Sequence, residues 1–600
     1  MLTWHSDDLL STTMVAKHPK RKILTLLKQL YSAEAATNLL SQIEERLVSY
    51  AKDNPSDRLS VVQSRLSQKD ALLITYADML QDARLLPLET LQKFAQKYLQ
   101  GVVSGIHLLP FYPHSSDDGF SVIDYHQVDP ALGDWADIQH LSQDFALMFD
   151  VVVNHVSSQS AWFQGFLRGD PRYQDYFITI DDAPDLTMVV RPRTTPLLTY
   201  FDTLSGSRQV WTTFSADQID LNYKNPKVLL ELVDLLLFYA AHGAQLIRLD
   251  AIAFVWKEPG TPCVHLPQTH AIVRLIRAIY DWVTPYMLII TETNVPHADN
   301  LSYFGDGSNE AHLVYNFTLP PLLLHTFRTG NCSTLNAWVD TFKLPSDQIT
   351  FFNFLASHDG IGLNPARGIL SDAEIEALVN QAERHGGLVS YKANANGSRS
   401  PYELNINYYD ALNDPQSLEP LDLQVDRFIC SQAVMLSLVG LPGIYFHSLF
   451  GSRGWTEGVK LLGYNRAINR RKLSRMDLEQ ALDDPDARRA KIYSRYKRLL
   501  LARASRAGFD PYGEQQSISL GPEVFGLMRW KRRSPADRII CLHNITAKSQ
   551  SVALNFEQIG IEAGHLAALT DLVTEQVHDY RETLTIELAP YQVCWLARAE

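Results

Sequence analysis

Between residues 71 and 510, short apolar runs alternate with longer segments of helical periodicity. Segments such as 228–240 and 272–281 have the helical spacing. The runs themselves are continuously apolar, as strands buried on both faces of a parallel sheet are. Eight of them lie at 72–76, 105–110, 147–153, 245–249, 287–292, 313–317, 351–356 and 443–446. Repeated strand–helix alternation of this kind predicts an α/β fold, a closed (β/α)8 TIM barrel.

Two connections in this region are too long to be simple links between a strand and a helix. The segment 156–235 is rich in Pro, Asp and Thr, and the segment 360–425 is rich in Gly, Asn and Ser. Each follows an apolar run. We therefore expect both to be insertions at the ends of barrel strands, where the loops of this fold build active sites.

The two ends of the chain have different patterns. In the first 70 residues, apolar side chains recur at helical spacing, which predicts two amphipathic helices joined near Ser32. They are Ile23, Leu26, Leu27, Leu30 and Tyr31, then Ala36, Leu39, Leu40, Ile43 and Leu47. After residue 510, apolar and polar residues alternate in the runs 524–531, 538–543, 551–556 and 583–588, which predicts half-buried antiparallel strands. We expect a helical extension packed on the barrel at 1–70, the barrel with its two insertions at 71–510, and a C-terminal β-domain at 511–600.

The charge balance is acidic, because 54 Lys and Arg side chains stand against 67 Asp and Glu, for a net charge of −13. Such a field repels phosphodiester backbones and anionic lipids, so no nucleic acid and no membrane is expected as a partner. Neither an apolar run of about 18 residues nor an export signal is visible. Five scattered cysteines without a Cys-x-x-Cys pair indicate the thiols of a reducing compartment. We therefore expect a cytoplasmic protein.

Ionisable side chains follow four of the apolar runs. Asp150 and the pair Asn154-His155 end one run, Arg248 and Asp250 end another, Glu292 ends a third, and His358-Asp359 follow a fourth. Polar groups at the carboxyl ends of barrel strands are typical of catalytic residues. A single aspartate in this position is more often structural than functional. Four strand ends carrying these groups in this order form a much narrower pattern.

Three acids at one mouth of a barrel suit the hydrolysis or transfer of glycosides. A retaining mechanism needs one ionised carboxylate as nucleophile and a second, protonated carboxyl as acid and then base. Arg248 points to the same side of its strand as Asp250 and is expected to keep that carboxylate charged. Glu292 follows an apolar run that favours a protonated carboxyl. Asp359, with His358, would stabilise the positive charge of an oxocarbenium-like transition state.

The order Asp-x-x-x-Asn-His, Arg-x-Asp, Glu, His-Asp resembles the α-amylase family of retaining glycosidases and transglycosylases, glycoside hydrolase family 13. The resemblance runs from about residue 71 to the C-terminus. It implies that Asp250 is the nucleophile, Glu292 the acid and base, and Asp359 the stabiliser of the transition state.

Finer motifs resemble the sucrose phosphorylase subgroup of that family. The segment from His107 to Phe120 resembles its donor loop, and the segment 358–362 is that subgroup's version of the fourth motif. The resemblance implies a phosphate-binding role for the second arginine of Arg191-Pro-Arg193 and a pairing of Arg470 with the donor-site aspartate. Guanidinium groups offer the forked donors that phosphate needs. The glucose site that the resemblance implies comprises Asp117, Phe120, His155, Arg248, His358 and Arg470.

Residues on the acceptor side depart from the sucrose enzymes. The runs Glu292-Thr-Asn294, Ala-Ser-His-Asp-Gly-Ile-Gly and Pro-Tyr402-Glu403-Leu-Asn resemble glucosylglycerate phosphorylases and, in part, glucosylglycerol phosphorylases. The resemblance implies that Asn294, Tyr402 and Glu403, with Arg193, bind the acceptor or phosphate, within acceptor loops at 360–425. Glu403 accepts hydrogen bonds only and sits awkwardly beside an acidic acceptor. A cation is needed to offset it, and the candidates are Lys392, Arg399 and Arg193.

The implied activity is the reversible phosphorolysis of an α-glucoside of a small acceptor, foremost glucosylglycerate. The partners are a small carbohydrate and inorganic phosphate as co-substrate, with no cofactor. No metal is expected either, since no cage of oxygen ligands is visible, and Asn154 is expected to order its loop. The alternatives are a sucrose phosphorylase, a glucosylglycerol phosphorylase, an α-glucosidase that uses water, and a catalytically inactive scaffold. All three acids are retained, which disfavours the scaffold.

Overall fold

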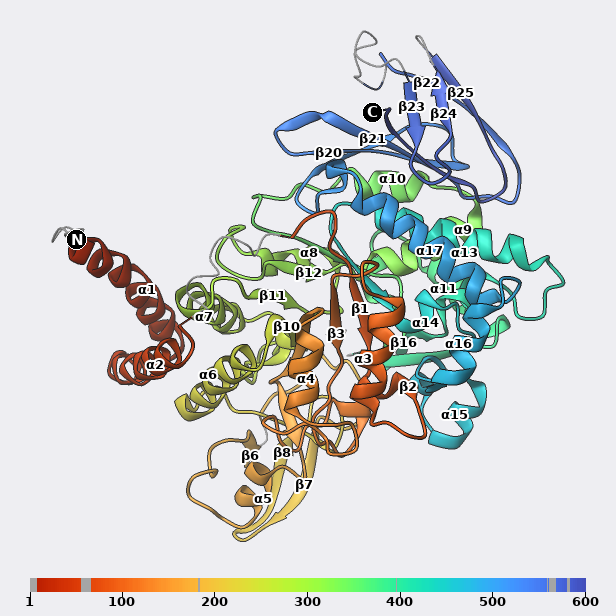
Figure 1. The fold of residues 1–600 in the computed structure, drawn as a ribbon. Helices are drawn as coiled ribbons and strands as arrows, with labels where there is room; N and C mark the ends of the chain where they lie inside the picture. Colours follow the sequence, from red (N-terminus) through yellow and green to blue (C-terminus); the bar gives the residue numbers. More distant parts are fainter. Residues whose placement is uncertain are drawn as a thin grey trace.

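The structure, a computed structural model, describes residues 8–55, 66–181, 184–394, 397–557, 559, 568–579 and 583–599. Within them, eight parallel strands close into a barrel in the order β1-β17-β13-β12-β11-β10-β4-β3 (Figure 1). The strands are β1 (Leu72–Thr75), β3 (Gly105–Leu108), β4 (Ala146–Val152), β10 (Ala244–Asp250), β11 (Leu288–Thr291), β12 (Leu313–Tyr315), β13 (Thr350–Asn353) and β17 (Leu441–Tyr445). Every predicted apolar run coincides with one of them, so the predicted barrel is confirmed.

The barrel closes because its first strand pairs on both edges. Leu72 of β1 lies opposite Gly105 of β3 and opposite Gly443 of β17. Both glycines are required by close packing. A Cβ on Gly105 would lie 2.6 Å from a Leu72 methyl group, and one on Gly443 would lie 2.3 Å from the ring of Phe352.

Helices surround the barrel and follow the strands along the chain (Figure 1). The helices are α3 (Pro87–Tyr98), α4 (Trp135–Ser142), α6 (Pro226–Ala241), α7 (Pro267–Val283), α8 (His297–Leu301), α9 (Leu319–Thr329), α10 (Ser333–Val339), α11 (Asp372–Arg384), α12 (Tyr408–Leu412), α13 (Leu421–Ser437), α14 (Phe446–Leu449), α15 (Thr456–Leu462), α16 (Arg475–Asp483) and α17 (Arg488–Ala504). Helix α6 begins at Pro226 behind its N-cap Asn225, so the excursion that we expected to reach residue 235 ends before this helix.

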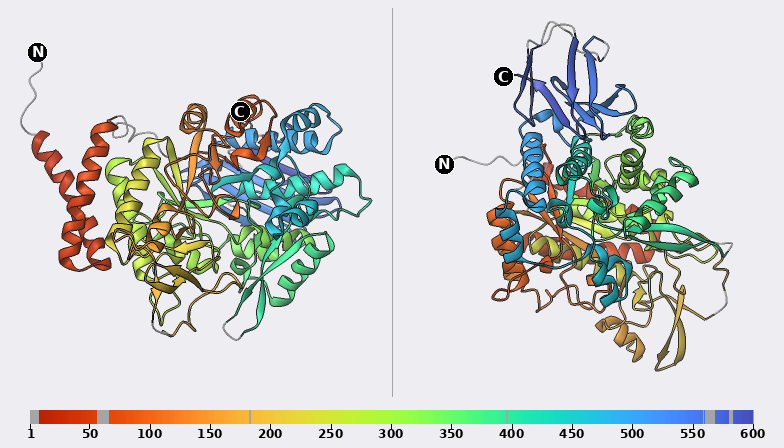
Figure 2. Two further views of the ribbon diagram at one scale, coloured as in Figure 1. Left: turned by 90° about the horizontal axis from the view of Figure 1, so that it is seen from below. Right: turned by 90° about the vertical axis from the view of Figure 1, so that its right-hand side faces the viewer.

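Two excursions leave the barrel after β4 and β13. The first contains α5 (Ala161–Leu167), the pair β5 (His155–Ser157) and β9 (Gln218–Asp220), and a sheet of β6 (Thr179–Ile180), β8 (Gly206–Trp211) and β7 (Leu198–Thr203). The second contains a sheet of β14 (Ile361–Gly362), β16 (Arg399–Asn405) and β15 (Leu388–Ala393). The first excursion lies at the opposite end of the barrel from the C-terminal sheet (Figure 2).

The N-terminal extension is a helical hairpin of α1 (Asp8–Leu30) and α2 (Ala33–Asp53). As predicted, Ser32 caps the second helix by accepting a hydrogen bond from the Ala35 N–H at 3.3 Å. The hairpin packs against α6 and α7, and Arg46 donates to Asp234 of α6 at 2.7 Å. Most of the apolar stripe is buried: Ile23, Leu27, Leu39, Ile43 and Leu47 are at most 1 % exposed, whereas Leu30, Tyr31 and Leu40 are partly buried.

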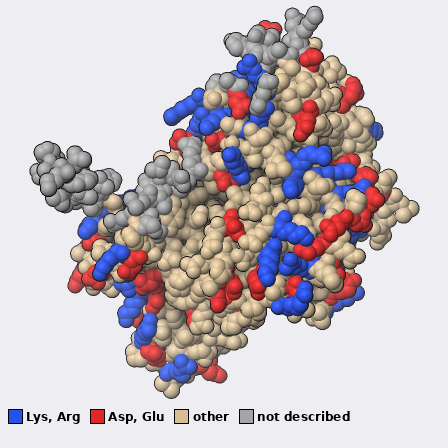
Figure 3. All heavy atoms as spheres, viewed as in Figure 1, with Lys and Arg blue, Asp and Glu red and all other residues tan. Residues whose placement is uncertain are grey.

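The C-terminal region is an antiparallel β-domain, as the alternating pattern predicts. One sheet has the order β19 (Glu514–Ile518), β20 (Val524–Lys531), β21 (Ser534–Asn544), β26 (Val593–Arg598), β23 (Ala568–Asp571) and β24 (Val577–Asp579). A second pair consists of β22 (Gln550–Asn555) and β25 (Thr583–Leu588). On the face drawn in Figure 3, basic and acidic side chains are interspersed. All five cysteines are buried free thiols, and no helix of the described residues is long and apolar enough to cross a membrane.

Candidate active site

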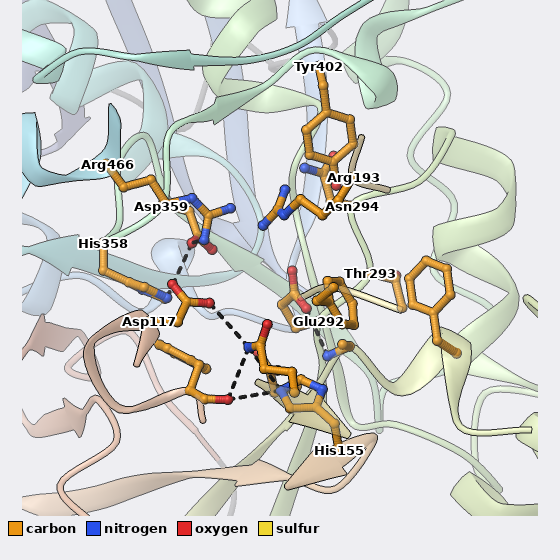
Figure 4. A pocket seen from close by; sticks show the side chains of 16 residues that line it. Asp117, His155, Arg193, Glu292, Thr293, Asn294, His358, Asp359, Tyr402 and Arg466 are labelled. Carbon is orange, nitrogen blue, oxygen red and sulfur yellow. Dashed lines mark hydrogen bonds and ion pairs between the residues drawn. The ribbon is translucent and has the colours of Figure 1, made fainter. Parts of the chain in front are cut away.

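A cavity of about 660 Å³ opens where the carboxyl ends of the barrel strands meet the two excursions (Figure 4). All the predicted site residues except Arg248, Arg470 and Glu403 line it. Figure 4 shows Arg193, Asn294 and Tyr402 on one side of the cavity and Asp117 and His155 on the other. The full lining is Asp117, Phe120, His155, Arg193, Phe214, Gln218, Asp250, Ala251, Phe254, Glu292, Thr293, Asn294, His358, Asp359, Tyr402 and Arg466.

The three predicted catalytic acids come from three strand ends. Asp250 is the last residue of β10, Glu292 directly follows β11, and Asp359 lies in the loop after β13. Arg248 is 2 % exposed and lies beneath the first two acids: its guanidinium donates to Asp250 at 2.7 Å and is 3.9 Å from Glu292. It also pairs with the buried Asp150. The barrel thus brings the acids to one cavity over a shared cation.

The pKa of Asp250 differs from our expectation, whereas that of Glu292 shifts in the expected direction. Burial raises the pKa of Asp250 well above its usual range, and the nearby Glu292 carboxylate adds to this, although Arg248 opposes it. Burial likewise raises the pKa of Glu292. Arg248 therefore does not hold Asp250 at a low pKa as expected, because burial and the neighbouring carboxylates of Glu292 and Asp150 outweigh its charge. Because the Glu292 charge raises the pKa of Asp250, the form with one proton on these two acids is favoured over the doubly ionised form.

This coupling predicts the pH dependence of the reaction. The active form carries one proton on the pair, so activity falls at low pH when a second proton binds and at high pH when the last one leaves. Because both pKa values are raised, the acid limb of kcat/KM should lie above the value of about 4 for ordinary carboxyls. Glu292→Gln removes the neighbouring charge that raises the pKa of Asp250. Its residual turnover of α-glucosyl fluoride should therefore lose the alkaline limb and show an acid limb at lower pH. Unmoved limbs would contradict the coupling.

Asp359 is held ionised by arginines. Burial alone would raise its pKa, but the guanidinium of Arg466, with contributions from Arg470 and Arg248, outweighs burial and holds the pKa below its usual value. Burial also keeps the pKa of His358 well below its ordinary range, so this imidazole is neutral. Its ring stacks on Phe120, with the ring centroids 4.7 Å apart.

The glucose side is built on the loop after β3. Asp117 has a φ of 53°, a left-handed conformation that aspartate tolerates at a cost, which indicates a position imposed by its surroundings. Gln218 of β9, which the sequence analysis missed, donates to Asp117 at 3.3 Å and to the Phe120 carbonyl at 3.2 Å. His155 contacts the same carbonyl oxygen at 2.9 Å.

Arg470 does not line the cavity. The resemblance led us to expect it to pair with the donor-site aspartate; its guanidinium forms an ion pair with Asp117 at 3.9 Å and a closer one with the neighbouring Asp118 at 2.7 Å. It also donates to the His358 carbonyl at 2.8 Å. Arg470 thus supports two cavity loops from behind.

Glu403 also differs from expectation. Its carboxylate faces Arg466, which donates to it from Nε at 3.1 Å and from a terminal nitrogen at 3.2 Å. Arg466 is therefore the cation that offsets Glu403, and none of Lys392, Arg399 and Arg193 forms an ion pair with it. Arg466 lies in none of the motifs named in the sequence analysis, which therefore missed it.

Arg193 reaches the cavity from the first excursion. Its guanidinium lies over the rings of Tyr402 and Phe214, at 5.7 and 6.0 Å from their centroids. Among the described residues, no carboxylate lies within ion-pair distance of it. Arg193 also lines a wider outer cavity of about 2040 Å³, which shares Asp117, Phe214, Gln218 and Arg466 with the inner one. An unpaired cation thus stands where the inner cavity opens outward.

A buried ammonium group joins the first excursion to the barrel. Lys257 is paired with Asp220 at 2.5 Å and donates to Asn154 at 2.6 Å and to the Phe254 carbonyl. Burial lowers the pKa of Lys257, although Asp220 opposes this. Among the residues that the structure describes, no group of three or more His, Cys, Asp or Glu side chains is placed to hold a metal ion.

We expect Lys257→Met to lower the free energy of unfolding by about 3–5 kcal/mol, because it leaves the fully buried Asp220 without its cation. The matched control is Lys227→Met on the exposed side of α6, for which we expect little change. Denaturant unfolding of both variants measures the difference. An equal, small effect of both substitutions would show that the buried pair adds no stability.

Comparison with known proteins decides the family. The model of the α-amylase catalytic domain matches residues 92–360. The glucosylglycerate phosphorylase of Spirochaeta thermophila is 48 % identical over 94 % of this chain and 95 % of its own. The chain belongs to the α-amylase family. The resemblance seen in the sequence is thereby confirmed.

Further relatives differ in how similar they are to this chain. The Escherichia coli glucosylglycerate phosphorylase is 44 % identical over 96 % of this chain and all of its own, whereas the sucrose phosphorylase of Agrobacterium vitis is 31 % identical over 71 % of this chain. The crystal structure of a sucrose 6F-phosphate phosphorylase from Thermoanaerobacter thermosaccharolyticum matches with a TM-score of 0.70 at 24 % identity, over 81 % of this chain and 96 % of that one. The amylase-type barrel is therefore shared, and among these relatives the glucosylglycerate phosphorylases are more similar to this chain than the sucrose phosphorylase is.

Proposed function

We propose that the protein is a retaining glycoside phosphorylase that acts on 2-O-α-D-glucosylglycerate and inorganic phosphate. Its products are α-D-glucose 1-phosphate and D-glycerate, and the reaction is reversible. One observation carries the proposal: Arg193, which has no carboxylate within ion-pair distance among the described residues, lies at the mouth of the cavity that is lined by the three candidate catalytic acids. The glucosylglycerate phosphorylases that match nearly the whole chain support the same reaction.

The first half of the reaction forms a glucosyl-enzyme. An Asp250 oxygen attacks the anomeric carbon while Glu292 gives its proton to the departing oxygen of glycerate, so that the glycosidic bond breaks and an ester bond to Asp250 forms with inversion. The coupled pair supplies both the charge and the proton for this step. Asp359, kept ionised by Arg466, stabilises the positive charge that develops on the sugar.

The second half transfers the glucosyl group to phosphate. A phosphate oxygen attacks the same carbon from the face that glycerate has left, Glu292 takes up the proton of the attacking phosphate hydroxyl, and the ester to Asp250 breaks with a second inversion. Two inversions restore the α configuration. Phosphate needs forked donors beside the glucosyl-enzyme, and Arg193 supplies them at the cavity mouth without a competing carboxylate. Asn294 and Tyr402 line the same side and complete the proposed acceptor site.

The charges on the acceptor side of the cavity support glycerate, an anion, as the acceptor. Glycerate and phosphate are both anions that occupy the same face of the glucosyl unit in turn, so an unpaired guanidinium serves each of them. The carboxylate of Glu403, which would repel an anion, is neutralised by Arg466. With a neutral acceptor such as fructose or glycerol, Arg193 would serve only the phosphate step.

The test is an incubation of the purified protein and phosphate with glucosylglycerate, glucosylglycerol or sucrose in separate reactions, with glucose 1-phosphate assayed in each. We expect kcat/KM to be highest by far for glucosylglycerate. Free glucose as the sole sugar product would contradict the phosphorylase assignment and favour an α-glucosidase. A preference for sucrose or glucosylglycerol would contradict the acceptor assignment, and no product from any donor would indicate a scaffold.

A further inference from the structure

Glu403 is tied to a catalytic acid through an arginine. Its side chain is 2 % exposed, and both of its oxygens accept from the fork formed by Nε and one terminal nitrogen of Arg466. The remaining terminal nitrogen of the same guanidinium pairs with Asp359. The three side chains therefore form a chain from the second excursion to the acid that faces the sugar.

The backbone supplies a second connection between the same residues. The N–H of Gly360, the residue after Asp359, donates to the Glu403 carboxylate. A Cβ on Gly360 would lie 2.5 Å from the Glu403 Cγ, so only glycine permits this approach. Glu403 thus holds the peptide next to Asp359 as well as the arginine that pairs with its carboxylate.

The Glu403 carboxylate limits how many guanidinium nitrogens of Arg466 can bind Asp359. While the fork is occupied by Glu403, one terminal nitrogen is left for Asp359. If the fork were released, Arg466 would be free to turn and bind both oxygens of Asp359, the geometry that an isolated Arg–carboxylate pair prefers. The Asp359 carboxylate would then turn toward the arginine and would no longer be oriented toward the anomeric carbon.

We infer that Glu403 is a positioning residue, which acts through Arg466 and Gly360 to aim Asp359 at the glucosyl unit and does not itself bind the acceptor. This inference rests on the proposed function. It moves Glu403 from the acceptor side to the donor side of the reaction. Loss of the Glu403 charge should accordingly slow the formation of the glucosyl-enzyme from any α-glucosyl donor, whatever its leaving group.

The experiment uses α-glucosyl fluoride, because fluoride makes none of the contacts of an acceptor. For Glu403→Gln, which keeps the shape but removes the charge, we expect the single-turnover rate of glucosyl-enzyme formation to fall about 10- to 100-fold, as misplacement of a catalytic group does. The KM for the fluoride should change little. The kcat for glucosylglycerate should fall by the same factor. Glu376→Gln on the exposed face of α11 is the matched control and should be unchanged in both.

Three results would overturn the inference. One is an unchanged rate with the fluoride together with a raised KM for glycerate in the synthetic direction, which would make Glu403 an acceptor-binding residue. Another is no effect on either substrate. If Glu403→Gln does not fold, Arg466→Lys serves in its place, because it keeps the charge beside Asp359 but loses the forked donors. The third contradicting result is a wild-type rate of glucosyl-enzyme formation from the fluoride in that variant. Failure of the proposed function is separate, because the wild-type protein would then form no glucose 1-phosphate.

Discussion

Asp250→Asn is expected to reduce turnover of glucosylglycerate by about four to six orders of magnitude, since an amide cannot form the covalent intermediate. The same loss is expected with α-glucosyl fluoride, because the attack on the anomeric carbon is common to both donors. Asp250 ends β10 and is held at 2.7 Å by Arg248, so the isosteric amide should keep the cavity intact. Steady-state kinetics with both donors measure the effect.

Glu292→Gln is the informative comparison for this variant. Fluoride leaves without a proton, so the glutamine variant should retain fast glucosyl-enzyme formation from the fluoride and lose it from glucosylglycerate. The two variants should thus differ in glucosyl-enzyme formation from the fluoride, whereas both should lose glucosyl-enzyme formation from glucosylglycerate. If Asp250→Asn kept substantial fluoride turnover, Asp250 would not be the nucleophile and the assignment of all three acids would have to change.

The barrel and the order of its acids were predictable because each depends on a local pattern. Strands buried on both faces are continuously apolar, and Asp250 and Glu292 stand directly at strand ends. The end of the first excursion was misplaced although its signal was present: Asn225 followed by Pro226 is a cap and first position typical of a helix start.

The arrangement around Asp359 was not predictable in the same way. Arg466 lies in the short 3-10 helix Asn465–Asn469, where its neighbours in sequence carry no pattern that points into a cavity. Its role depends on contacts with residues 63 positions (Glu403) and 107 positions (Asp359) away along the chain. The mutual orientation of Glu403 and Arg466 is a tertiary property, so the sequence could indicate only that Glu403 needs a cation.

Arg193→Ala is expected to separate phosphorolysis from hydrolysis. Removing a guanidinium that donates two charge-assisted hydrogen bonds to phosphate should lower kcat/KM for phosphate about 100- to 1000-fold. Capture of the glucosyl-enzyme by water needs no such donor, so hydrolysis should change less than about 10-fold. The ratio of glucose 1-phosphate to glucose formed at fixed phosphate concentration measures this partition directly.

Arg191→Ala provides the matched control for the arginine variant. Arg191 belongs to the same loop, but it lines neither cavity and donates to the Thr195 carbonyl. Its loss should leave the partition between phosphate and water unchanged. Arsenate, which has the shape and charge of phosphate, should lose efficiency with Arg193→Ala to the same extent as phosphate. Equal losses of phosphorolysis and hydrolysis in Arg193→Ala would mean that Arg193 shapes the cavity as a whole, and the unpaired charge at its mouth would then not be what makes this barrel a phosphorylase.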